Sequence, residues 1–242
     1  MPSRWTLTLA SRDPGRPERP VTPAQLHGLA ATLLEGTDAD HHAQHKPHTV
    51  SPLLASPHPG TALLRLGWLP DRPRPDLTLL LGQELRLGAQ FFTVRDADEE
   101  HTPYELLRHA PPAERAILRF RSVTYFSRRG HWYPLPDPGL VYGGLIRRWN
   151  LHAPPQALIT EEDGKRFLPL LALSAHDIAS APVDLGPSAG RIGFTGTAAF
   201  RLVGPATGTD RRLLSALTLY ATAAGIGAQT THGLGTVETE LE

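Results

Sequence analysis

Two periodicities divide the first half of the chain into strands and one helix. Alternating apolar and polar positions predict strands over residues 3–10, 46–53, 61–69 and 89–94. The stretch 22–36 has helical spacing instead, with a capping box formed by Thr22 and Gln25 at its start and Gly36 at its end. Residues 72–88 fit a helix or a strand equally well. The acidic stretch 96–112 is interpreted as a connection between domains that carries one short helix.

The second half shows both periodicities more clearly. Strands are predicted over residues 115–126, 166–179, 190–203 and 236–241, and helices over 137–150 and 210–225. This order, strand–helix–strand–strand–helix–strand, is that of a ferredoxin-like unit. The first half begins in the same order. The sequence therefore predicts an α+β protein of two tandem ferredoxin-like domains, residues 1–111 and 112–242.

The composition excludes several kinds of functional site. The 242 residues include no cysteine, which excludes disulfides, thiolate zinc sites and a cysteine nucleophile. No apolar run is long enough to span a bilayer, and the N-terminus lacks the apolar core of a signal peptide, so we expect a cytoplasmic protein. The formal net charge is zero and therefore does not indicate nucleic-acid binding. Almost every basic residue is arginine, which is typical of a GC-rich genome.

The stretch 225–235, GIGAQTTHGLG, holds two Gly-x-Gly units. It lacks the Lys-Ser/Thr ending of a P-loop and the third glycine of a dinucleotide site. A helix precedes it and a strand follows, so it lies at the negative end of a helix dipole, away from the helix N-terminus that binds phosphate. The small polar residues between the glycines could still contact a nucleic-acid backbone. From these residues alone, a binding loop and a helix cap with a bulge are equally open.

A second dense stretch, DADHHAQHKPHTVSP, covers residues 38–52 and holds His41, His42, His45 and His48. Imidazole is the commonest metal ligand, so a metal cluster is one interpretation, although the spacing does not match a zinc site. A solvated, histidine-rich loop after a helix is a second. A third is acid–base catalysis, because a neutral imidazole exchanges protons near pH 7.

The glycine stretch resembles the C-terminal signature of CRISPR-associated protein family six, a family of endoribonucleases in the repeat-associated mysterious protein (RAMP) superfamily. KPHTVSPL (46–53) is similar to the early Lys-Pro-Phe-Thr segment of that family. LRFRSVTYF (118–126) and LPDPGLVYGGLIRRWN (135–150) are similar to its mid-chain strand and helix, and IGFTGTAAFRL (192–202) to the strand before its last helix. The resemblance covers nearly the whole chain in order, and the family's two ferredoxin-like domains agree with the predicted fold.

The resemblance implies an endoribonuclease that cuts precursor CRISPR RNA within its repeats and needs no metal and no cofactor. Its catalytic histidine would stand six residues before Pro47, at His41, with His42 as the next choice and His45 as the third. The 2′-hydroxyl of the RNA is the nucleophile, and the products carry a 2′,3′-cyclic phosphate and a 5′-hydroxyl. Lys46 would offset the negative charge of the phosphorane.

One feature of the family is missing from the predicted first helix. Some members place a catalytic tyrosine there, whereas this chain has Ala31 at about that position. His27, on the polar face of this helix, is the nearby titratable residue. It could partly replace the tyrosine, but we expect it to face solvent.

CRISPR repeat RNA is the partner that the resemblance implies. The expected contacts are the glycine stretch and two arginine pairs: Gly225, Gly227, Gln229, Thr230, Thr231, His232, Gly233, Gly235, Arg128, Arg129, Arg147 and Arg148. Trp132 and Tyr133 could stack on bases. The alternative function is a non-catalytic RNA-binding subunit of a CRISPR interference complex. Association with other subunits or into a homodimer is left open, and no membrane partner is expected.

Overall fold

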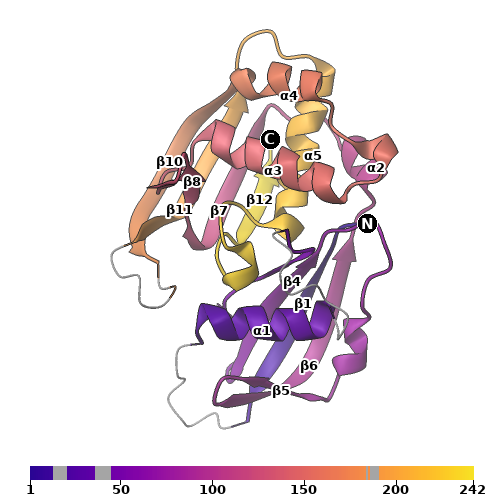
Figure 1. Ribbon diagram of the computed structural model, residues 1–242, viewed down its shortest axis with the longest axis vertical. Coiled ribbons are helices and arrows are strands. Elements are labelled where there is room, and N and C mark those ends of the chain that lie inside the picture. The colour runs from indigo at the N-terminus through magenta and orange to yellow at the C-terminus, as the bar shows by residue number, and fades with distance from the viewer. Residues whose placement is uncertain (13–20, 36–44, 184, 186–190) are drawn as a thin grey trace.

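The computed structural model describes residues 1–12, 21–35, 45–183, 185 and 191–242. Two antiparallel sheets follow one another along the long axis of the molecule (Figure 1). The first sheet holds β1 (Ser3–Ser11), β2 (His48–Val50), β3 (Leu54–Ala55), β4 (Thr61–Trp68), β5 (Glu84–Leu87) and β6 (Gln90–His101). The second holds β7 (Arg115–Thr124), β10 (Leu171–Pro182), β11 (Ile192–Leu202) and β12 (Val237–Leu241), and β8 (Phe126–Arg128) pairs with β9 (His131–Tyr133) in a separate hairpin.

The first sheet has the order β2-β4-β1-β6-β5, and helix α1 (Pro23–Leu34) covers one of its faces. Thr22 and Gln25 form the predicted capping box, and Leu26, Ala30 and Leu34 are buried against the sheet. The order β2-β4-β1-β6 is the ferredoxin-like arrangement. In the ambiguous stretch 72–88, the second helix of the unit is reduced to the 3-10 turn η1 (Leu77–Leu80), and β5 follows it.

Strand β6 continues through residues that the sequence assigns to a connection between domains, so the interpretation of 96–101 is wrong. The whole of β1 pairs with β6, up to the pair Ser3–His101. The acidic side chains of this part of β6 are tolerated because they lie at the surface, where Glu100 pairs with Arg4 at 2.6 Å. The expected short helix is α2 (Tyr104–Arg108).

The second sheet has the order β10-β11-β7-β12, which is again ferredoxin-like. Helices α3 (Pro138–His152) and α5 (Gly208–Ala224) pack on it, each at a position that the sequence predicts. The predicted strand at 166 begins too early, because Thr160 caps an additional helix, α4 (Glu161–Phe167), and the turn η3 (Leu168–Leu170) follows. The other short turns are η2 (Pro155–Ala157) and η4 (Thr230–His232).

The two units pack directly on each other. The buried Thr49 hydroxyl donates to the carbonyl of Ala223, at the end of α5, over 2.7 Å. Gly67 on β4 makes this approach possible, since a Cβ there would lie 2.1 Å from the same carbonyl oxygen. Tyr104 on α2 packs into the core of the second unit. The boundary at residue 111 stays a prediction. No helix in the described part of the chain is long and apolar enough to cross a membrane.

Candidate functional site

The glycine stretch forms a tight loop between α5 and β12, and its glycines are required by its shape. Gly225 ends α5 with a φ of 64°, and Gly227, Gly233 and Gly235 have φ values of 84°, 88° and 71°. L-residues with side chains rarely adopt such angles. A Cβ on Gly235 would also lie 1.9 Å from the carbonyl oxygen of Ile226. The stretch therefore acts as a helix cap, one of its two open interpretations, and this role is compatible with binding.

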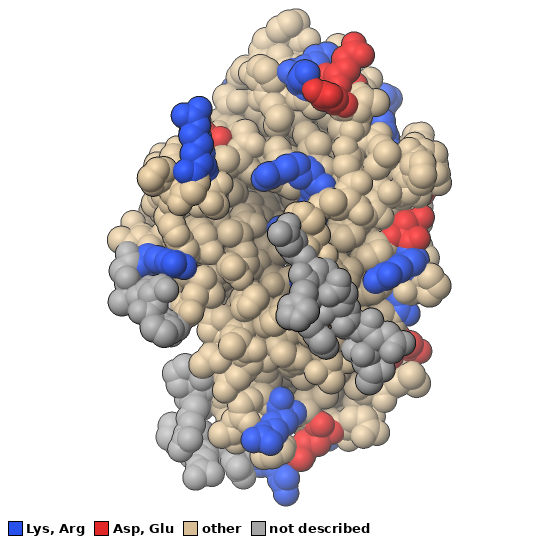
Figure 2. Space-filling view, viewed as in Figure 1, with Lys and Arg blue, Asp and Glu red and all other residues tan. Residues whose placement is uncertain are grey.

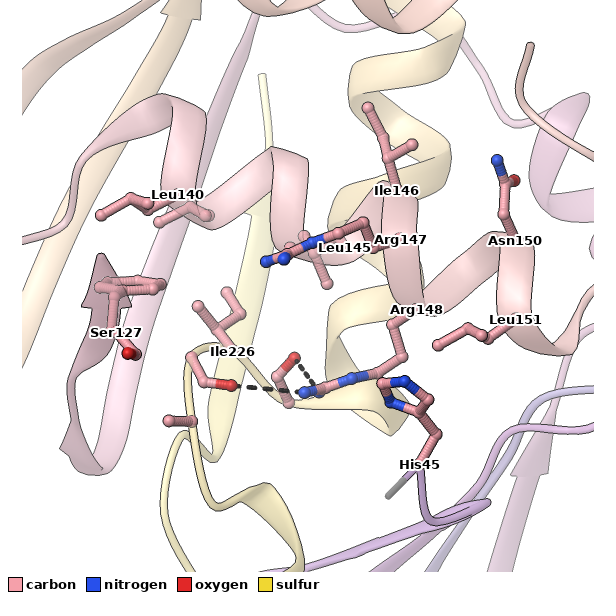
Figure 3. Close-up of a pocket in the computed structure, with 16 residues that line it drawn as sticks. His45, Ser127, Leu140, Leu145, Ile146, Arg147, Arg148, Asn150, Leu151 and Ile226 are labelled. Carbon is pink, nitrogen blue, oxygen red and sulfur yellow. Dashed lines mark hydrogen bonds between the residues drawn. The ribbon is translucent and has the colours of Figure 1, made fainter. Parts of the chain in front are cut away.

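Arg148, on α3, holds the start of this loop. Its guanidinium donates to the carbonyl of Ala224 and to those of Gly225 and Gly227 at 3.2 and 3.3 Å (Figure 3). These carbonyls lie at the C-terminus of α5, where a cation is favoured. Arg148 is thus engaged within the protein, whereas the neighbouring Arg147 is exposed.

The other side of the loop packs on α1, as the yellow segment above α1 in Figure 1 shows. Gly233 makes room for Leu26, because a Cβ there would lie 2.6 Å from the Leu26 Cδ1 atom. His27 Nδ1 lies 3.1 Å from the carbonyl oxygen of Thr231, and the His27 ring stacks on the ring of His232 at 4.3 Å, with 3° between the planes. The expectation that His27 faces solvent is therefore wrong, because α1 turns that side toward the loop of the second unit.

A row of titratable groups continues from this stack into the first unit. The His48 ring lies 6.0 Å from that of His27, and its Nδ1 atom lies 3.0 Å from Glu35 Oε1, although without hydrogen-bond geometry. Glu35 Oε2 accepts a hydrogen bond from Lys46 Nζ at 3.2 Å. Lys46 thus lies next to a carboxylate at the end of α1, where the C-terminus of the helix adds to the attraction.

Burial decides the charge of two of these histidines. Desolvation lowers the pKa of His48 to about 4, against the opposing effect of Glu35. Desolvation, followed by the effect of His27, also lowers the pKa of His232 to about 4. Both rings are therefore neutral at pH 7.

A pocket of about 780 Å³ opens beside the loop, between α3, the β8–β9 hairpin and the first unit. Arg147 and Ile226 line it, and His45 enters from the first unit next to Arg148 (Figure 3). A second cavity of about 900 Å³ shares His45 and Leu151 with this pocket. The two cavities together form a groove along the boundary between the units.

The preferred catalytic candidates, His41 and His42, lie outside the described residues. The chain on either side of them is described: both Glu35 and His45 line the second cavity. His45 is exposed. Among the described residues there is no group of three or more His, Asp or Glu side chains placed to hold a metal ion.

The remaining residues that we predicted to contact RNA differ in their exposure to solvent. Gln229 is exposed, whereas Thr230 is buried. Arg128 and Arg129 are exposed at the tip of the β8–β9 hairpin. Figure 2 shows basic side chains spread over one face of the molecule, several of them beside acidic ones, with a hollow between the two units. The Trp132 ring stacks on Tyr125 at 3.7 Å and lies 4.3 Å from the Arg191 guanidinium, so it is already engaged within the protein.

Sequence reasoning missed Glu35 and the position of His27. The sequence does not indicate that Glu35 belongs to the site, because its partners, Lys46 and His48, follow only after the next loop. One signal in the sequence could have indicated that His27 is half-covered. His27 lies three and seven residues before the apolar Ala30 and Leu34, so it shares a side of α1 with them.

Comparisons with known proteins agree with this architecture. A family model described as CRISPR-associated endoribonuclease Cas6 matches residues 118–237. No match is found among curated proteins. A solved Cas6 product complex is 27% identical, with 99% of each chain covered and a TM-score of 0.81. A product complex of a Cas6 from Thermus thermophilus is also 27% identical, covering 99% of this chain and 100% of that chain with a TM-score of 0.80.

A third solved structure is a Cas6 mutant in which one histidine is replaced by alanine. It is 26% identical, covers 99% of this chain and 98% of that chain, and has a TM-score of 0.76. The similarity of these structures spans both units, and the family model includes the glycine loop, α3 and α5. The chain belongs to the family of CRISPR-associated endoribonucleases named Cas6.

Proposed function

We propose that this endoribonuclease cuts precursor CRISPR RNA within its repeats, without a metal ion, by attack of the RNA 2′-hydroxyl on the adjacent phosphate. The observation that carries the proposal is the meeting of the glycine-rich loop with α1. This contact brings His232 and His27 together and continues through His48 and Glu35 to Lys46. Titratable side chains from both units thus meet at the boundary between the units, with His48 and Glu35 buried and His27 and His232 half-buried.

In this proposal His41 or His42 exchanges a proton with the reacting oxygens, and the products carry a 2′,3′-cyclic phosphate and a 5′-hydroxyl. A neutral imidazole suits this task near pH 7. Lys46 stabilises the charge of the phosphorane, and Glu35, 3.2 Å away, fixes the position of its ammonium group. Support comes from the relatives solved as product and substrate-mimic complexes, one of them also as a histidine-to-alanine mutant.

RNA binding is divided between exposed and buried groups. We assign direct contacts with the repeat RNA to the exposed residues Arg128, Arg129, Arg147 and Gln229. The loop glycines and Arg148 act by shaping the surface that the RNA meets, since the Arg148 guanidinium is held by loop carbonyls. Exposed arginines suit phosphates because their planar fork can donate two hydrogen bonds to one phosphate.

Labelled repeat RNA incubated with the protein in EDTA tests the proposal. We expect one discrete cut whose upstream product ends in a cyclic phosphate. Single His41→Ala, His42→Ala and His45→Ala variants identify the histidine, since its loss should slow cutting by ~10²–10⁴-fold and leave binding intact. Binding without cutting by the natural sequence would favour an RNA-binding subunit, and loss of cutting only in EDTA would favour a metal.

A further inference from the structure

Gly144 lies in the interior of helix α3, where glycine is unfavourable. Helix α3 runs from Pro138 to His152, and apart from proline no residue disfavours a helix interior more than glycine does. The backbone of Gly144 is helical and lacks the positive φ that would require glycine. Of the described atoms, a Cβ on Gly144 would meet only the Arg147 Nη2 atom, at 4.0 Å. Neither the conformation nor the packing of α3 therefore explains this glycine.

A position in the wall of a pocket does explain it. Gly144 lines the pocket of about 780 Å³ beside the glycine-rich loop. Leu140 and Arg147, about one turn away on either side, line the same pocket, so one face of α3 forms a wall of it. Phe126 of the hairpin and Ile226 of the loop also line it. The missing side chain at Gly144 leaves space in this pocket and lets a bound group approach the helix backbone.

The charge of the pocket indicates what it can hold. Arg147 and Arg148 both line it, and among the residues that the structure describes no aspartate or glutamate does. Arg148 is held by the loop carbonyls, whereas Arg147 is exposed and makes no hydrogen bond or ion pair with the described part of the chain. In Figure 3 the Arg147 side chain reaches from α3 over the pocket, toward the side of Ser127 and Leu140. A ligand with an anionic group and a planar, weakly polar part suits such a pocket.

We propose that this pocket binds one unpaired nucleotide of the repeat RNA, with its base against Gly144 and the apolar wall and its phosphate on Arg147. The inference rests on the proposed function and names the part of the RNA that the pocket takes. A base paired within a duplex cannot enter a pocket, whereas an unpaired base can leave the stack. The planar fork of Arg147 can donate two hydrogen bonds to the phosphate. Gly144 is then the position that admits the base.

The test compares variants of two neighbouring glycines of α3. Gly143 lies beside Leu168 rather than in the pocket, and its Cβ would make an ordinary contact of 3.8 Å with the Leu168 Cδ1 atom. Gly143→Ala and Gly144→Ala should both raise the melting temperature, because alanine is the best helix former. Gly144→Leu should fill the pocket and weaken the affinity for labelled repeat RNA about tenfold, the loss typical of one displaced base. Gly144→Ala should weaken the affinity less, and Gly143→Ala should bind RNA as the natural sequence does.

Repeat RNAs with a single abasic nucleotide identify the bound base. When the abasic site is moved along the repeat, one position should weaken binding to the natural protein about tenfold. The same abasic RNA and the unmodified RNA should bind Gly144→Leu equally well, because this variant excludes the base from its pocket.

Two results would overturn the inference. One is natural RNA affinity of a folded Gly144→Leu variant, or of Gly144→Ala if the leucine variant does not fold. The other is a set of abasic losses that is the same in the natural protein and in the Gly144 variant. If the natural protein does not bind repeat RNA at all, the proposed function itself fails, which is a different result.

Discussion

Glu35 and Lys46 form an ion pair at 3.2 Å in which the side chains are only 6% and 11% exposed. The pair joins the C-terminal end of α1 to the residues that lead into β2. Removal of one partner from a buried pair leaves the other charge desolvated and unpaired. We therefore expect Glu35→Gln to lower the free energy of unfolding by about 3 kcal/mol, measured by urea denaturation.

The exposed pair Lys165–Glu161 is the control for this substitution. Its side chains are 75% and 83% exposed. Glu161→Gln should change the free energy of unfolding by about 0.5 kcal/mol or less, because solvent screens this pair. Equal effects of the two substitutions would show that Glu35 does not stabilise the fold through a buried charge.

Arg147 and Arg148 are neighbours in the sequence with opposite environments, and their alanine variants should differ. Arg147→Ala should weaken repeat-RNA binding and reduce its dependence on salt, because an exposed phosphate contact releases counterions. It should leave the melting temperature unchanged. Arg148→Ala should lower the melting temperature, because it frees the carbonyls of Gly225 and Gly227. A salt dependence unchanged by Arg147→Ala would remove Arg147 from the interface.

Gly235→Ala should lower the free energy of unfolding more than Gly82→Ala does. Gly235 and Gly82 have similar φ values, 71° and 76°, so both substitutions carry a strain of about 1 kcal/mol. A Cβ on Gly82 meets nothing within 4 Å, whereas one on Gly235 lies 1.9 Å from the Ile226 carbonyl oxygen. Denaturation curves should show a larger loss for Gly235→Ala, and equal losses would mean that the loop relaxes freely.

Stability should fall as the pH drops from about 6.5 toward 4. Desolvation lowers the pKa values of His48, His152 and His232 to about 4 in the folded protein, against 6.5 for the unfolded chain. Between these values the unfolded chain binds more protons, so acid favours unfolding, and the full stability is present above pH 6.5. His152→Gln should flatten the fall in the free energy of unfolding between pH 7 and 5. A natural protein equally stable at pH 7 and 5 would contradict this expectation.

Much of the fold could be predicted from the sequence because its signals are local. The capping box of Thr22 and Gln25 and the cap of Asp137 are made by residues within one turn, and the structure confirms both. The alternating strands specified the ferredoxin-like order in each half. The misjudged stretches, 96–101 and 166–170, are those in which pairing with β1 or a helix cap outweighed the apparent pattern.

The candidate site, in contrast, depends on contacts between residues far apart in the chain. The glycine spacing indicated a special loop, but only the packing of α5 against the first unit decides that this loop meets α1. Arg147 and Arg148 look alike in the sequence, and the turn of α3 alone exposes one and directs the other to the loop carbonyls. His27 and His232 form a stack because the two units pack together. A local pattern of side chains does not predict such packing, because the burial and the partners of each site residue depend on the whole surface of the other unit.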